Sequence, residues 1–359
     1  MNEQVTTPVK NSLSQNYIHY FSSLRCIAMI AVIIIHTVAN TIGNYSQFLN
    51  SHQIFIGVFL KSITITWAVP IFIMISGALF LDKTKELSLS KLYSKYILRL
   101  ILVLLTFGVL YALMEIVFYE HKINFRIILL SLKNVYEGKT WDHLWFVYML
   151  IGLYIITPLL KILINNSNKQ MIYYNLIILF IFTCFIPVLN LFTNTSFNIR
   201  IPSTSIYLFY YIMGYALHNK IIRINSYICF ILVIISLLYC SFGQFIPNML
   251  IKNDSGYSLL LASQDSIIGV ITSISIFSLF QTFNKQKTNW LDTIIAPLSF
   301  GVYIIHMLFM NIIFKLLHFT PEHYNVYLIW LTVFITSLLL SLITVFLLRK
   351  ITIIRKWLL

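Results

Sequence analysis

The feature that most constrains the fold is a succession of long apolar runs that fill nearly the whole chain. They occupy about residues 20–43, 54–81, 95–119, 143–164, 171–191, 203–219, 224–243, 257–281, 293–318 and 324–347. Most approach the ~20 residues that an α-helix needs to cross a bilayer. Charged residues make up 10% of the chain and the mean hydropathy is +0.84, so there is too little polar surface to cover a water-soluble globule. We therefore predict an all-α polytopic membrane protein with about ten transmembrane helices.

The basic residues lie in short clusters between the apolar runs, where they act as orientation signals. More of them fall on the inner side when the amino terminus is placed inside, so we expect both termini to be cytoplasmic in a multi-pass protein of the cell (plasma or inner) membrane. The expected parts are a polar cytoplasmic amino terminus (1–19) without a cleaved signal peptide, a transmembrane domain (20–347) and a basic cytoplasmic tail (348–359). The net charge of +14 then reflects topology and membrane lipids, and we expect no nucleic acid partner.

Two ionisable residues interrupt the first apolar run, Arg25 and His36. Their separation of eleven residues is three helical turns with about 20° left over, so they share one helix face about 16 Å apart along the axis. Charged and titratable side chains are costly in lipid, which favours a protein interior or a water-filled cavity. Arg25 near the inner face can instead be a snorkelling residue, and His36 can be a structural hydrogen-bonding residue. We predict that the pair lines a single water-accessible groove.

Polar residues at the end of the longest outer loop form a second group. Asp142 and His143 lie between Trp141 and Trp145 at the start of the fourth apolar run. Indole rings stack on sugar rings while polar groups bond the hydroxyls, so this turn can bind a glycan. An ordinary belt of aromatic residues at the membrane boundary explains the same pattern.

Later runs carry three further polar intrusions. Tyr303 and His306 are three residues apart and therefore share a helix face, and Asp265 lies in the eighth run as a partner for Arg25 or an independent helix contact. The intramembrane histidines come from separate segments without the local spacing of metal ligands, so we expect no metal.

Four sets of residues occur in a fixed order along most of the chain. They are Arg25 and His36; Val69, Pro70, Phe72, Ser76 and Gly77; His143 to Phe146 followed by Leu153 to Leu159; and Gly301, Tyr303 and His306. This combination resembles the integral-membrane acyltransferase family 3. Within that family the layout is similar to the membrane-only type that O-acetylates enterobacterial common antigen.

The resemblance implies a transmembrane O-acyltransferase, with acetyl-CoA or another acyl-CoA as cytoplasmic donor and a hydroxyl of a cell-envelope glycan or lipid-linked sugar as acceptor. It implies catalytic roles for His36, as general base or transient acyl carrier, and for Arg25, which would also bind the donor. Tyr303 and His306 are then expected to contact the donor. Ser76 and Gly77 are expected to permit close helix packing.

For the acceptor, the resemblance together with the aromatic turn favours Asp142, His143 and Trp145. Two other classes of protein remain as alternatives. An exporter or flippase of an exopolysaccharide would use Arg25 and His36 to line a conduit without acyl transfer. An ion-coupled transporter would use Asp265 and His306 as a proton relay, but it predicts an internal repeat, and the sequence shows none.

Overall fold

The computed structural model of the chain describes residues 19–120, 125–193, 195, 197, 205–242, 263–283 and 290–359, and every regular element among them is a helix. Seven helices in these ranges are long and apolar enough to cross a membrane, which confirms the predicted all-α polytopic membrane protein. They are His19–Phe48, Ser51–Phe80, Leu89–Phe118, Asp142–Asn166, Lys169–Asn190, Leu291–Leu316 and Val326–Leu348. Three other expected spans correspond to shorter helices, α11 (Ile206–His218), α12 (Ser226–Phe242) and α15 (Ile267–Thr282). Residues 1–18 of the expected polar amino terminus lie outside the described residues.

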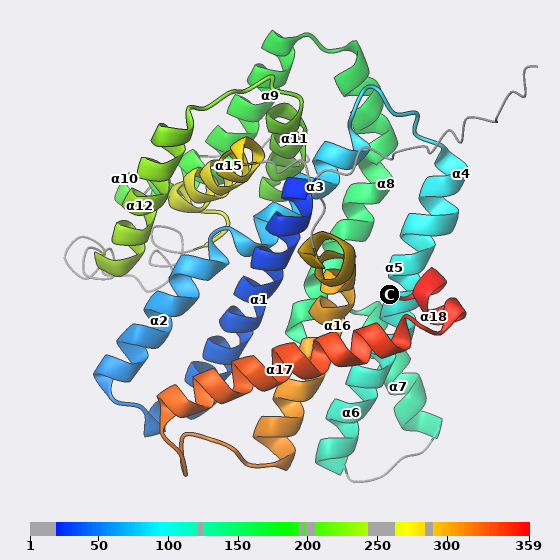
Figure 1. Cartoon of the computed structure of the whole chain (residues 1–359), viewed down its shortest axis with the longest axis vertical. Coiled ribbons are helices and arrows are strands. Elements are labelled where there is room, and N and C mark those ends of the chain that lie inside the picture. The colour runs from blue at the N-terminus through cyan, green and yellow to red at the C-terminus, as the bar shows by residue number, and fades with distance from the viewer. Residues whose placement is uncertain are drawn as a thin grey trace, which may run out of the picture.

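Helix α1 (His19–Tyr45) lies inside the bundle (Figure 1). Leu24, Ala28 and Ile33 along it are fully buried, as expected for a helix enclosed by neighbours on most sides. Its partners are α2 (Ser51–Ile65), α3 (Ala68–Phe80), α15, α16 (Ser299–Asn311) and α17 (Val326–Leu348). The helix that carries Arg25 and His36 is therefore surrounded by protein along much of its length.

The second apolar run is two helices joined at Thr66 and Trp67. Proline has no N–H to donate, so Pro70 fits the first turn of α3, where backbone N–H groups lack partners inside the helix. The indole Nε1 of Trp67 donates to the carbonyl oxygen of Ile63, 2.7 Å away, and fastens the junction. The sequence thus restarts a helix at Ala68 instead of continuing the first one.

Helices α3 and α11 cross with their backbones in contact. A Cβ added to Gly77 would lie 1.8 Å from the carbonyl oxygen of Tyr211, and one added to Gly214 would lie 2.0 Å from that of Met74. Small residues allow this approach, which is common between membrane helices. The expected packing role of Gly77 is therefore what the structure shows.

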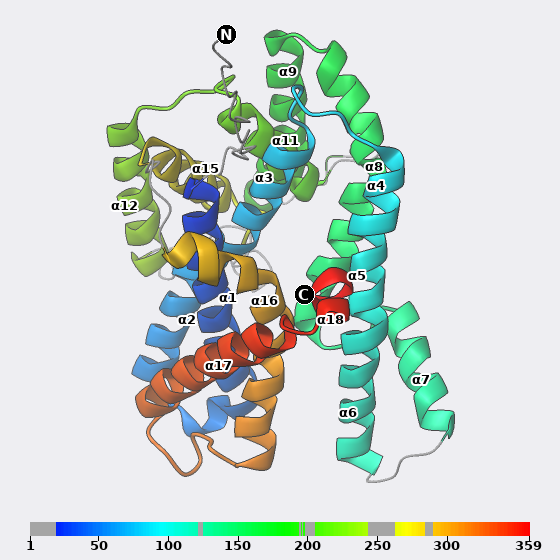
Figure 2. The same cartoon turned by 45° about the vertical axis from the view of Figure 1, so that its right-hand side comes forward.

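The remaining helices enclose this centre. The third span contains α4 (Leu89–Lys91), α5 (Leu98–Val103) and α6 (Val109–Glu120), joined by π-helical stretches, and it is followed by α7 (Phe125–Tyr136), α8 (Trp145–Asn166), α9 (Lys169–Phe180) and α10 (Ile186–Thr193). Beyond α17 the chain turns into the short helix α18 (Thr352–Trp357), which lies against α5 (Figure 2). Leu359 is buried, so the segment expected as a basic tail packs onto the bundle.

The outer faces of the helices are apolar too. On α17, Leu331 and Ile343 are more than half exposed, as is Ile228 on α12. Apolar surface in water costs roughly 25 cal/mol per Å², so faces of this kind require a lipid covering.

Candidate active site

Arg25 and His36 lie on the single continuous helix α1, as their spacing predicts. They do not line one groove, however. Arg25 lines a cavity of about 350 Å³, whereas His36 lines a separate cavity of about 750 Å³. The expectation of one shared groove is therefore wrong: Phe146 of α8 and Tyr303 of α16 line the cavity at Arg25, whereas His36 has the rings of His143 and His306 beside it.

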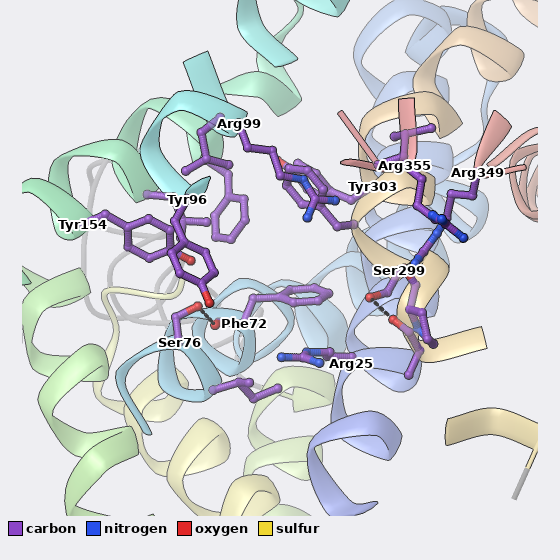
Figure 3. A pocket seen from close by; sticks show the side chains of 18 residues that line it. Arg25, Phe72, Ser76, Tyr96, Arg99, Tyr154, Ser299, Tyr303, Arg349 and Arg355 are labelled. Atoms are coloured by element: carbon purple, nitrogen blue, oxygen red, sulfur yellow. Dashed lines mark hydrogen bonds between the residues drawn. The ribbon is translucent and has the colours of Figure 1, made fainter. Parts of the chain in front are cut away.

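The cavity at Arg25, here called the arginine cavity, is lined by four guanidinium groups (Figure 3). Arg25 comes from α1, Arg99 from α5, and Arg349 and Arg355 from the end of the chain. No acidic residue is among its described lining. Burial lowers the pKa of Arg349, with a further contribution from the positive charge of Arg355. Four guanidinium groups that line one cavity favour an anionic ligand.

An adjoining hollow of about 490 Å³ extends this cavity. The two share Arg25, Ser76, Tyr96 and Tyr154 in their linings, and the hollow adds Lys85, Lys91 and Glu86. Ser76 therefore faces cavity space, beyond the packing role expected for it. Together they form an elongated, mainly cationic site.

The cavity at His36, here called the polar cavity, has a different lining. Four amides face it, from Asn40, Asn44, Asn134 and Asn311. Its aromatic lining residues are Tyr45, Trp141 and Phe314, and its charged ones are Glu115, Lys139, Asp142 and Lys315. The Lys315 ammonium is 2.8 Å from the Glu115 carboxylate, which also accepts a hydrogen bond from the Trp141 indole at 3.0 Å. Such a mixture of amides and aromatic rings suits a neutral, hydroxyl-rich ligand.

Three imidazole rings from three helical segments meet at the inner end of the polar cavity. The ring of His36 is 5.2 Å from that of His306 and 6.2 Å from that of His143, and the latter two are 5.3 Å apart. We call these residues the histidine cluster. His143 and His306 are fully buried. Among the described residues, no group of His, Cys, Asp or Glu is arranged to hold a metal ion.

Backbone carbonyls hold the two buried imidazoles of the cluster. Nε2 of His143 is 3.1 Å from the Ile304 oxygen, and Nδ1 of His306 is 3.1 Å from the Val302 oxygen. A carbonyl can only accept, so each of these nitrogens carries the proton. The other nitrogens, Nδ1 of His143 and Nε2 of His306, are buried without a hydrogen-bond partner.

Three rings in the lining of the arginine cavity, those of Phe72, Phe146 and Tyr303, pack in series, and we call them the aromatic wall. The Phe146 ring is 5.2 Å from that of Tyr303 and 6.2 Å from that of Phe72. The Tyr303 hydroxyl donates to the backbone oxygen of His143, and its ring is 6.0 Å from that of His306. Two layers of rings therefore separate the arginine cavity from His36.

The three residues expected to bind the acceptor lie in three different surroundings. Asp142 lines the polar cavity and His143 belongs to the histidine cluster. Trp145 lies elsewhere, partly exposed and packed against Tyr207, with ring centroids 5.6 Å apart. The tryptophan that lines the polar cavity is Trp141. Trp141 and Trp145 flank the short 3-10 turn Asp142–Leu144, and only Trp141 lines the polar cavity.

Asp265 is not part of either cavity. The neighbouring Gln264 is hydrogen-bonded to Tyr207 and Tyr210, whereas His306 lies beside His36 and Tyr303. This separation does not support a direct proton relay between Asp265 and His306.

Sequence reasoning treated Arg99, Arg349 and Arg355 only as orientation signals. No motif marks them, and they become site residues because α18 folds back beside α5. The polar positions Asn40 and Asn311 carried a weak signal, since amides within apolar helices often face a cavity.

Comparison with known protein families gives one match. The family model described as an acyltransferase domain, acyltransferase 3, matches residues 18–349. The matched region includes all residues that line the two cavities except Arg355 and Leu359 of the arginine cavity. No curated protein and no solved structure matches the chain.

Proposed function

Because the chain belongs to the acyltransferase 3 family and is a membrane acyltransferase, we propose that it is an O-acyltransferase that carries an acyl group, in the simplest case acetyl, across the cell (plasma or inner) membrane. The donor is acyl-CoA and the acceptor is a hydroxyl of a cell-envelope glycan or lipid-linked sugar. One observation carries the proposal: a cationic cavity and a polar aromatic cavity meet on opposite sides of the aromatic wall and the histidine cluster.

The arginine cavity supports an acyl-CoA donor. The nucleotide end of coenzyme A bears several phosphate charges, and guanidinium groups bind phosphate oxygens through paired hydrogen bonds. Arg25, Arg99, Arg349 and Arg355 reach the cavity from three parts of the chain, and Lys85 and Lys91 extend the positive region. The thioester then lies toward Tyr303, at the aromatic wall.

The polar cavity supports a glycan acceptor. Its amides can donate to and accept from sugar hydroxyls, and Trp141 offers an aromatic face. The Tyr111 ring stacks on the other side of Trp141 with a centroid distance of 4.2 Å, which holds the indole in place. Asp142 lines the same cavity and gives an acceptor for a sugar hydroxyl.

His36 is the group suited to activate the acceptor. A neutral imidazole takes the proton of the hydroxyl while its oxygen bonds to the acyl carbonyl carbon. The carbon–sulfur bond breaks, and the departing thiolate of coenzyme A takes up the proton. Base assistance of this kind contributes roughly 10²–10⁴-fold to the rate. For this step the pantetheine arm has to carry the thioester past the aromatic wall to His36, while the nucleotide stays in the arginine cavity and the glycan in the polar cavity.

The test is acyl transfer by the purified protein in lipid nanodiscs, supplied with labelled acetyl-CoA and envelope glycan. We expect labelled glycan from the wild type and from a His52→Ala control, because His52 is exposed and bonded to Tyr327 away from both cavities. His36→Ala should lower transfer by at least 10²-fold while acetyl-CoA binding persists. Mass analysis of envelope glycans from cells with each variant gives the same comparison in vivo.

Glycan transport without consumption of the thioester would instead support an exporter. The two ring layers between the cavities argue against that reading, because a polysaccharide conduit needs a continuous passage. Full activity in His36→Ala would refute the assignment of the base.

A further inference from the structure

The two unpartnered nitrogens of the histidine cluster need a hydrogen-bond donor. Nδ1 of His143 and Nε2 of His306 are acceptors, because backbone carbonyls fix the proton on the other nitrogen of each ring. Both rings are fully buried, where an unsatisfied polar group is unfavourable. A donor must therefore come from the surrounding side chains or from a trapped water.

The aromatic neighbours of the cluster already use their polar hydrogens. The hydroxyl of Tyr303 donates to the oxygen of His143, and the hydroxyl of Tyr111 donates to that of Ile304. The indole N–H of Trp141 donates to Glu115. Among the described rings in contact with the cluster, the N–H of His36 is thus the polar hydrogen left to share.

The ring positions favour His306 as its acceptor. The centroid distance from His36 is 5.2 Å to His306 and 6.2 Å to His143. Two imidazoles joined by an N–H···N bond have centroids roughly 5 to 6 Å apart, given a donor–acceptor distance of about 3 Å. The structure shows no hydrogen bond on Nε2 of His306, so this bond requires rotation of the His36 ring; His143, whose ring is farther away, is the less favourable acceptor.

We propose that His306 is a positioning residue whose Nε2 accepts the N–H of His36 and thereby fixes the tautomer of the base. The inner nitrogen of His36 then carries the proton, and the outer nitrogen presents its lone pair to the polar cavity. This inference rests on the proposed function, in which His36 accepts the proton of the acceptor hydroxyl. Val302 completes the arrangement, because its carbonyl holds the proton on Nδ1 of His306 and keeps Nε2 free to accept.

The hydrogen bond between His36 and His306 persists while His36 takes up and releases the hydroxyl proton. As the hydroxyl oxygen bonds to the acyl carbon and the carbon–sulfur bond breaks, the hydroxyl proton moves to the outer nitrogen of His36. The resulting imidazolium still donates its inner N–H to His306, so that bond strengthens as the positive charge develops. The proton on the outer nitrogen then goes to the thiolate, and His36 returns to its original tautomer.

The first experiment needs no substitution. In ¹⁵N-histidine-labelled protein reconstituted in lipid, solid-state NMR should detect a nitrogen–nitrogen coupling across the hydrogen bond between His36 and His306. The coupling is assigned by its loss in His306→Leu and its retention in His143→Leu. A wild-type spectrum that shows no such coupling would overturn the proposal, whatever the activity of the protein.

The second experiment separates positioning from packing. His306→Gln keeps an acceptor near the position of Nε2, and His306→Leu removes it at similar bulk. We expect kcat to fall roughly 10²-fold in His306→Leu with an unchanged KM for acetyl-CoA, and His306→Gln to recover at least tenfold of that loss. His143→Leu, the matched control, loses an equally buried ring and one carbonyl bond and should lower kcat less.

Equal kcat values in His306→Gln and His306→Leu would count against the role of the acceptor, as would equal losses in His306→Leu and His143→Leu. Failure of the proposed function has a different signature. In that case the wild-type protein would not consume acetyl-CoA, while the NMR coupling would still report on His306.

Discussion

Replacement of Gly77 by alanine should destabilise the protein far more than the same methyl addition at a helix glycine with free space around it, such as Gly152. The new Cβ would lie 1.8 Å from the Tyr211 carbonyl oxygen, 2.6 Å from its carbon and 2.9 Å from its Cα. All three atoms belong to the backbone of α11, so no side chain can rotate away. The oxygen would have to retreat by about 1.6 Å to reach an ordinary contact of 3.4 Å.

That displacement has consequences for neighbouring helices. The Tyr211 hydroxyl is 2.9 Å from Oγ1 of Thr157 on α8, and Ser76, next to Gly77, lines the arginine cavity. Overpacking against a rigid core costs about 1–3 kcal/mol, and contact with backbone places Gly77→Ala at or above the upper end. A loss of about 3 kcal/mol changes the ratio of folded to unfolded protein by more than roughly 100-fold.

The assay is thermal unfolding in detergent, followed by tryptophan fluorescence and by the fraction of protein that elutes as a monodisperse peak. Gly152→Ala on α8 is the control, since a Cβ there meets nothing within 4 Å. It should match or slightly exceed the wild type, because alanine favours a helix by about 0.5–1 kcal/mol over glycine. Equal unfolding temperatures for Gly77→Ala and Gly152→Ala would refute the backbone-contact reasoning.

Three further predictions concern the two cavities and the loop after α3. In steady-state kinetics, Arg355→Ala should raise KM for acyl-CoA roughly 10-fold or more, as expected for a lost charge-assisted hydrogen bond. Lys356→Ala, on the same helix but outside the cavity lining, should leave this KM unchanged. Trp141→Ala should raise KM for the glycan roughly 2–10-fold, from a stacking energy of about 0.5–1.5 kcal/mol, and a similar effect of Trp145→Ala would contradict the cavity assignment. Asp82 should stabilise the fold near neutral pH: burial raises its pKa, but hydrogen bonds from the N–H and hydroxyl of Thr84 and the charge of Lys85 outweigh burial and lower it. This stability is present above the unfolded carboxyl pKa of about 3.9 and is lost as pH falls through the lower folded value, so unfolding temperatures of wild type and Asp82→Asn should differ at pH 7 and converge below pH 4.

Part of this molecule follows from local sequence rules. The apolar runs predict membrane helices, and the eleven-residue spacing predicts that Arg25 and His36 share α1. Tyr303 and His306 do lie on one helix, three residues apart, as their numbering requires. These predictions succeed because helical geometry alone relates positions within one segment.

Contacts between helices that are far apart in the sequence could not be predicted in the same way. The separation of Arg25 from His36 depends on Tyr303 and Phe146, which reach the same place from α16 and α8. Arg355 enters the arginine cavity only because the chain reverses after α17. Such placements arise from tertiary packing, which has no periodic signature in the sequence.

The aromatic wall has a consequence for the cell as a whole. A continuous water channel through an energised membrane would dissipate the ion gradients that drive ATP synthesis, since protons move quickly along connected water. The packed rings of Phe72, Phe146 and Tyr303 place apolar surface between the arginine cavity and the histidine cluster. We therefore expect the protein to conduct no protons between its two cavities when no substrate is bound.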